Sequence, residues 1–186
     1  MDALDALRRS LERSDVIRIG RYRYFVHPVS DGIPAIDPAL LDGLAAEMAS
    51  RLDGGFDRIL TVEALGIPVS TALSLRLGKP LTIVRKKKYG LPGEVAVPST
   101  TGYATHTLYL NGINKGDRVL FVDDVLSTGG TLRAVAGAVR LAGAVLSGAL
   151  VVIEKGPNLR RLEGELGIAI KSLVKVEIKD GKVVAR

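Results

Sequence analysis

The chain of 186 residues contains no cysteine and no tryptophan, and it has only 2 methionines. Without cysteine it can form no disulfide, no thiolate metal site and no cysteine nucleophile. No stretch approaches the roughly 20 consecutive apolar residues that a membrane helix needs. The first 15 residues have the pattern of a charged amphipathic helix and not that of a signal peptide. We therefore expect a cytoplasmic protein.

The composition predicts one well-packed domain. Hydrophobic residues make up 47% of the chain, which suits a single α/β core and is too little for two cores of comfortable size. We therefore expect one domain over residues 1–186. The formal net charge of +6 is compatible with a nucleic-acid partner or with a pocket for a substrate that carries several phosphates. Charge alone does not choose between them.

The most informative segment is 119–132, VLFVDDVLSTGGTL. Its apolar start at 119–122 predicts a strand buried on both faces, as in a parallel sheet, and a helix is predicted over 132–141. Hydroxyls, small residues and the unpaired N–H groups of a helix start lie between the two, and such groups bind an anion without a lysine. The predicted phosphate site consists of Ser127, Thr128, Gly129, Gly130 and Thr131.

Two acids, Asp123 and Asp124, follow the predicted strand where it leaves the core. Two carboxylates would repel a phosphate unless hydrogen-bond donors lay between them, and vicinal sugar hydroxyls meet that need. The segment therefore predicts a ribose 5-phosphate ligand. The absence of a lysine after the glycines disfavours a nucleoside triphosphatase, and adjacent Gly129-Gly130 do not fit GxGxxG. An ordinary strand-to-helix turn is the remaining alternative, which the paired acids disfavour.

This segment resembles the phosphoribosyl-pyrophosphate motif of type I phosphoribosyltransferases. The resemblance extends from VHPVSDGIP at 26–34 to about Ser172 and is strongest to the archaeal hypoxanthine phosphoribosyltransferase group. It implies that Asp123 and Asp124 hold the ribose and that 127–131 surround the 5-phosphate. It also implies Mg²⁺ held mainly through the substrate, and a cytoplasmic homodimer that transfers phosphoribose from phosphoribosyl pyrophosphate to a purine.

A second strand, short loop and helix are predicted at 58–77. The resemblance makes the loop between them the pyrophosphate site, and a plain connector is the alternative. Ligands of a parallel sheet gather at the carboxyl ends of its strands, so we expect both loops to lie together. The residues of this second loop are Glu63, Ala64, Leu65 and Gly66.

A basic run at 85–88 opens a segment with little hydrophobic periodicity, from 86 to 104. Basic runs are usually solvated, but long irregular loops in compact domains are usually lids or binding loops. This segment resembles the flexible catalytic loop of purine phosphoribosyltransferases, especially the adenine branch. The resemblance makes Arg85 and Lys86 candidates for stabilising the leaving pyrophosphate, and Glu94 is a candidate proton carrier.

The choice of purine stays open. Many 6-oxopurine enzymes have an aspartate at the position of Ser127, and adenine enzymes commonly have a glutamate where this chain has Gly102 before Tyr103. Lys155 lies near where 6-oxopurine enzymes place a lysine against the exocyclic oxygen, so the resemblance there favours hypoxanthine or guanine, whereas Glu154 could accept from the amino group of adenine. Side-chain alternation lets only one of the two face the pocket. The candidate base-binding residues are Val125, Glu154 and Lys155.

The alternation of strands and helices predicts a doubly wound, mostly parallel sheet, with a small cap formed by the two terminal segments. The amino-terminal segment of this cap is expected to comprise residues 1–36. A half-exposed strand at 18–26 should pack its tyrosines on the domain; stacking on nucleic acid is the alternative. His27 and His106 are expected to be structural. A regulator of the same fold that binds nucleic acid is disfavoured because no helix-turn-helix module is visible. A pyrimidine enzyme of the same fold is the other alternative.

Overall fold

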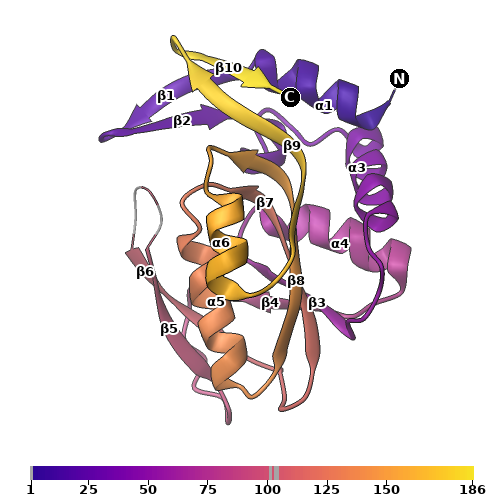
Figure 1. The fold of residues 1–186 in the computed structure, drawn as a ribbon, viewed down its shortest axis with the longest axis vertical. Coiled ribbons are helices and arrows are strands. Elements are labelled where there is room, and N and C mark those ends of the chain that lie inside the picture. Colours follow the sequence, from indigo (N-terminus) through magenta and orange to yellow (C-terminus); the bar gives the residue numbers. More distant parts are fainter. Residues whose placement is uncertain (1, 101, 103–104) are drawn as a thin grey trace.

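The computed structural model describes residues 2–100, 102 and 105–186. Within these residues a six-stranded sheet consists of β3 (Arg58–Val62), β4 (Leu81–Val84), β7 (Arg118–Leu126), β8 (Val145–Lys155), β9 (Ile170–Lys179) and β10 (Lys182–Ala185). Their order is β10-β9-β8-β7-β3-β4 (Figure 1). β10 pairs antiparallel with β9, and the other neighbouring pairs are parallel. The predicted mostly parallel sheet is confirmed.

Helices cover both faces of this sheet (Figure 1). One face packs against α1 (Ala3–Glu12), α3 (Pro38–Ser50) and α4 (Gly66–Leu77), and the other against α5 (Gly130–Leu141) and α6 (Leu159–Leu166). The side chains of β7 alternate between the two layers: Leu120 and Val122 belong to the first, Val119 and Phe121 to the second. Burial on both sides explains why residues 119–122 are apolar without interruption.

The amino-terminal segment differs from the prediction. Instead of one strand over 18–26, it forms a hairpin of β1 (Asp15–Ile19) and β2 (Tyr22–Val26), followed by the short helix α2 (Pro28–Asp31). Gly20 has a left-handed φ of 60° in the turn. Basic and apolar residues alternate on both sides of this turn, so the pattern does not reveal where the chain reverses. The hairpin lies beside α1 and β10 at one end of the molecule (Figure 1).

The strand β7 is longer than the sequence predicted. β7 extends to Leu126, so Asp123 and Asp124 lie inside the strand and not beyond it. The cause is the long neighbouring strand β8, which offers Val151 as a partner for Asp123 and Glu154 for Leu126.

The predicted irregular segment 86–104 contains the strand β5 (Val95–Thr100), which pairs with β6 (Thr105–Leu110). Pro98 argued against a strand at this position in the sequence, because a proline cannot donate a backbone hydrogen bond, although proline is tolerated at the edge of a sheet. Tyr103 and two other residues of the segment, 101 and 104, lie outside the described part of the chain. Among the described residues, no helix is long and apolar enough to cross a membrane.

Candidate active site

A cavity of about 320 Å³ lies at the carboxyl ends of β3, β7 and β8. Parallel strands bring the predicted segments together there. Its wall contains the loop 63–65, the acids of β7 with Val125, the phosphate loop 127–131, Lys86 and Lys155. Four other candidates lie outside the wall: Gly66, Arg85, Glu94 and Glu154.

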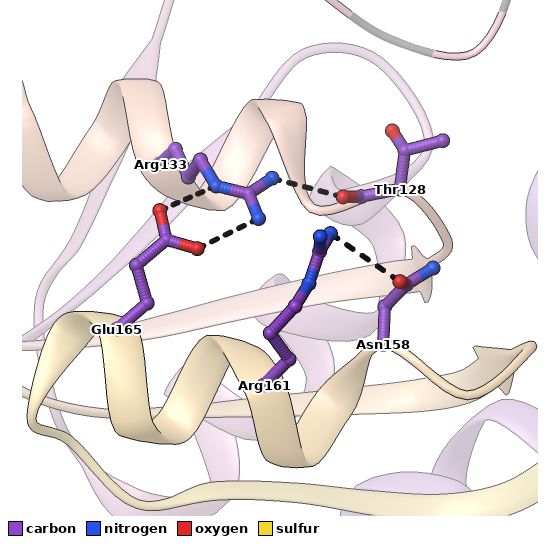
Figure 2. A network of polar contacts seen from close by, with 5 residues as sticks. All are labelled: Thr128, Arg133, Asn158, Arg161 and Glu165. Carbon is purple, nitrogen blue, oxygen red and sulfur yellow. Dashed lines mark hydrogen bonds and ion pairs between the residues drawn. The ribbon is translucent and has the colours of Figure 1, made fainter.

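Residues of α5 and at the start of α6 hold the carbonyl groups of the phosphate loop, and Figure 2 shows the contact of Arg133 with Thr128. Asn158, directly before α6, donates from Nδ2 to the Ser127 carbonyl at 3.0 Å, and Arg133 of α5 donates to the Thr128 carbonyl at 3.0 Å. A trans peptide directs its carbonyl and the following N–H to opposite sides. The N–H groups of Thr128 and Gly129 therefore point away from these anchors, and both residues line the cavity. Amides held in this way at the start of α5 suit an anion.

Gly129 is required at its position in this loop. Its φ of 82° lies in the left-handed region, and the side chain of Leu162 occupies the space that a Cβ would need. Arg133 is itself held by Glu165, with Nε to Oε1 at 2.6 Å and Nη2 to Oε2 at 2.8 Å. The sequence did not reveal the supporting role of Asn158, Arg133 and Glu165, because their partners lie in other elements and no local pattern marks them.

The two acids form a close pair at the floor of the cavity. Asp123 is buried, and its Oδ1 accepts the backbone N–H of Asp124 at 3.1 Å. Burial raises the pKa of Asp123 well above its ordinary value, and the negative charge of Asp124 raises it further. Burial likewise raises the pKa of Asp124, to about 6. A pair of this kind is stabilised by bound hydroxyl donors or by a cation.

The acid pair also fits a metal ion that arrives with the substrate. The described residues contain no group of three or more acids or histidines that could hold a metal by itself. Mg²⁺ is usually bound by one or two carboxylates together with oxygens of the substrate. Asp123 and Asp124, two of the carboxylates in the cavity wall, could take this part, with the other ligands supplied by the substrate.

The loop after β3 is organised around Glu63. Its carboxylate pairs with Arg85 Nε at 2.8 Å and accepts the backbone N–H of Lys86. Burial would raise the pKa of Glu63, but these hydrogen bonds and the positive charges lower it below its ordinary value. Arg85 is thus engaged outside the cavity, while Lys86 reaches its wall. The structure therefore separates the two basic residues that the sequence grouped together.

Glu94 lies away from the cavity. Its carboxylate accepts from Asn111 Nδ2 at 3.0 Å and from the backbone N–H groups of Tyr89 and Gly90 at 2.9 and 3.1 Å. The hydrogen bond from Asn111 is the largest of the effects that lower its pKa. These contacts close the turn at 89–94. The position does not support Glu94 as a proton carrier.

Of the two residues at the end of β8, Lys155 faces the cavity. Its Nζ lies 3.8 Å from the centroid of the Tyr22 ring. Glu154 is buried on the other side of the strand, where it pairs with Lys175 at 3.3 Å and accepts from Ser172 Oγ at 3.2 Å. The alternation of side chains along β8 thus directs the ammonium group of Lys155, and not the carboxylate of Glu154, to the cavity.

The amino-terminal cap and β6 also contribute to the wall, which the sequence interpretation missed. Asp31 lines the cavity and accepts hydrogen bonds from Tyr24 Oη at 2.6 Å and Ser30 Oγ at 2.7 Å.

His106, expected to be structural, is exposed and lines the cavity. His27 is buried and accepts the N–H of Val29 at Nδ1, as a structural residue does. The basic and aromatic alternation of β2 was the available signal, since Tyr22, Tyr24 and Phe25 all reach the wall.

Fold and site together define the class of protein. Residues 36–164 match the family model of the phosphoribosyl transferase domain, and the chain belongs to this family. It is 46% identical to the hypoxanthine/guanine phosphoribosyltransferase of Methanohalophilus mahii, over 97% of this chain and 94% of that protein. With the hypoxanthine/guanine phosphoribosyltransferase of Methanothermobacter thermautotrophicus the identity is 49%, over 97% and 93% of the two chains.

A solved structure supports the same assignment. The crystal structure of adenine phosphoribosyltransferase from Thermoanaerobacter pseudethanolicus superimposes with a TM-score of 0.73 at 27% identity, covering 92% of this chain and 99% of that one. The predicted resemblance to type I purine phosphoribosyltransferases is confirmed.

Proposed function

We propose that this protein transfers the 5-phosphoribosyl group of phosphoribosyl pyrophosphate to a 6-oxopurine, hypoxanthine or guanine, in purine salvage. The observation that carries this choice is the presence of Lys155, and not Glu154, in the cavity wall. An ammonium group donates to the exocyclic oxygen of a 6-oxopurine but cannot accept from the amino group of adenine. The names of the relatives from Methanohalophilus mahii and Methanothermobacter thermautotrophicus agree with this choice.

In the reaction, a purine nitrogen forms a bond to the anomeric carbon, the bond from that carbon to the pyrophosphate oxygen breaks, and the proton of the attacking nitrogen is released. The amides of 127–131 would hold the 5-phosphate, while Asp123 and Asp124 would hold the ribose hydroxyls and stabilise the positive charge that develops on the ring. The backbone of 63–65 and Lys86 would bind the departing pyrophosphate. Mg²⁺, bound through the substrate and the acid pair, would supply charge neutralisation of the pyrophosphate.

Adenine is the competing substrate, because the solved relative from Thermoanaerobacter pseudethanolicus is an adenine phosphoribosyltransferase. It would require a hydrogen-bond acceptor at the purine end of the cavity. Glu154, the acceptor that the sequence offered there, is engaged with Lys175 and Ser172 behind β8. A homodimer and a cytoplasmic location remain part of the proposal.

The test is an assay of nucleotide formation from phosphoribosyl pyrophosphate and Mg²⁺ with hypoxanthine, guanine, adenine or xanthine, and with orotate and uracil as pyrimidine controls. We expect the nucleotides of hypoxanthine and guanine, and no product after chelation of the metal. Turnover of adenine alone would overturn the 6-oxopurine assignment. Product from no purine would overturn the whole proposal.

A further inference from the structure

Tyr22 links the two ends of the cavity. It is the first residue of β2, and its hydroxyl shares a hydrogen bond of 2.8 Å with Oγ of Ser127 in the phosphate loop. The face of the same ring lies against Lys155 at the other end, with 3.8 Å from Nζ to the ring centroid. Lys155 also donates to the carbonyl of Arg23, the next residue of β2. One strand of the cap thus contacts both a phosphate-loop side chain and the ammonium group at the purine end.

A third segment rests on the same ring. A Cβ added to Gly102 would come within 2.7 Å of Tyr22 Cε2 and 3.5 Å of Thr128 Cγ2. Gly102 therefore packs against both the tyrosine and the phosphate loop, in a place where a larger residue would push the ring. Tyr22, which is half-buried, thus contacts three parts of the chain that are remote in sequence, so tertiary contacts define its position together with the hairpin.

We propose that Tyr22 is a positioning residue that couples the phosphate end of the site to the purine end. Its hydroxyl orients the Ser127 side chain, and its ring holds the Lys155 ammonium group by a cation–π contact. The second half of this inference rests on the proposed function, because it uses Lys155 as the purine-binding group. The first half requires only that the loop binds a sugar phosphate.

The two halves predict different effects for two substitutions. Tyr22→Phe removes the hydroxyl and keeps the ring, so it should weaken binding of ribose 5-phosphate and raise KM for phosphoribosyl pyrophosphate by about three- to tenfold, as expected for one hydrogen bond. KM for hypoxanthine should stay near that of the wild type. Tyr22→Leu removes the ring as well and should in addition raise KM for hypoxanthine by about two- to fivefold.

The decisive experiment is a double-mutant cycle of Tyr22→Phe and Ser127→Ala, followed by calorimetric titration with ribose 5-phosphate. If the hydroxyl acts through Ser127, Tyr22→Phe causes no further loss of affinity once the serine is replaced. Losses that simply multiply, or wild-type affinity in Tyr22→Phe, would overturn the inference. Tyr109→Phe is the matched control, because it removes the same atom from a tyrosine of β6 outside the cavity wall.

Failure of this inference can be distinguished from failure of the proposed function. Titration with ribose 5-phosphate needs no purine, so the coupling to Ser127 is measured even if no purine is turned over. A wild-type protein that binds no ribose 5-phosphate overturns the inference together with the phosphate-site assignment. A wild-type protein that makes nucleotides while Tyr22→Phe changes neither affinity nor KM overturns the inference alone.

Discussion

Gly66 lies directly against the carboxylate of Asp123. A Cβ built on Gly66 would overlap both Asp123 Oδ1 and Thr61 Oγ1. The first residue of α4, at the end of the loop 63–66, is thereby packed against Asp123 of β7. Gly66 was predicted only as part of that loop. The structure shows instead that the close approach of the two segments excludes a side chain at this position.

Gly66→Ala should therefore damage the site through Asp123. The added methyl group has to displace a carboxylate and a buried threonine, and we expect a loss of stability of about 1–3 kcal/mol. It should also reduce kcat/KM for phosphoribosyl pyrophosphate by about tenfold or more, because small displacements of a binding group are costly. Denaturant unfolding and initial rates measure the two effects.

Gly137→Ala provides the control for this substitution, since Gly137 lies in α5 and a Cβ added there would meet no atom of another element within 4 Å. There the same change should stabilise the protein by about 0.5–1 kcal/mol through helix propensity. If Gly66→Ala had wild-type kinetics, the contact with Asp123 would not matter for the site.

The acid pair should make the free protein less stable as the pH rises. The pKa of both carboxyls is raised by burial, and that of Asp124 is about 6 against an ordinary 3.8. Between these values the folded protein retains protons that the unfolded chain has lost, so the free energy of unfolding falls as the pH increases from about 4 through about 6. The raised pKa of Asp123 adds to this fall. Denaturant unfolding at a series of pH values measures the slope.

The double variant Asp123→Asn, Asp124→Asn should flatten this slope and be more stable than the wild type at neutral pH. It should also lose binding of ribose 5-phosphate. Asp53→Asn is the control, because the Asp53 side chain is 94% exposed and its loss should leave the slope unchanged. A double variant that still binds the sugar phosphate would refute the ribose assignment.

The anchor behind the phosphate loop should influence substrate binding more than stability. Arg133→Lys cannot keep both the bidentate pair with Glu165 and the bond to the Thr128 carbonyl. We expect KM for phosphoribosyl pyrophosphate to increase about two- to tenfold, while the free energy of unfolding changes by less than about 1 kcal/mol because the ion pair is partly exposed. Arg76→Lys, at an ion pair with Asp42 on another surface, should change neither. An unchanged KM in Arg133→Lys would show that the loop amides need no support from α5.

Lys155→Met should change the choice of purine. Removing a charged donor to the exocyclic oxygen should lower kcat/KM for hypoxanthine by about ten- to a hundredfold. The rate with adenine should not fall in parallel, since its amino group receives nothing from the ammonium. Lys175→Met is the matched control, because Lys175 pairs with Glu154 outside the cavity wall. Equal losses with both purines would mean that Lys155 does not contact the base.

The sequence could predict that the loops 63–65 and 127–131 and the acid pair lie together in one cavity wall, because each of these parts is local. A buried strand, a short loop and a helix start occur in continuous order at 58–77 and at 119–132, and the parallel arrangement of the strands brings such loops to one edge of the sheet. The prediction erred where a neighbour determines the outcome: β8 extends β7 through the acids, and β6 converts part of the irregular segment into β5. Pairing partners of this kind leave no mark in the strand that they extend.

The amino-acid sequence by itself determined the doubly wound sheet, the loop 127–131 before a helix and the acid pair, since each depends on residues close together along the chain. Only the tertiary structure decided which side chains support them. Tyr22 and Ser127 are 105 residues apart, and Arg133 meets Glu165 across two helices. Such contacts depend on the order of the strands and on where the cap folds back, and the periodicity of a single sequence does not encode either of these.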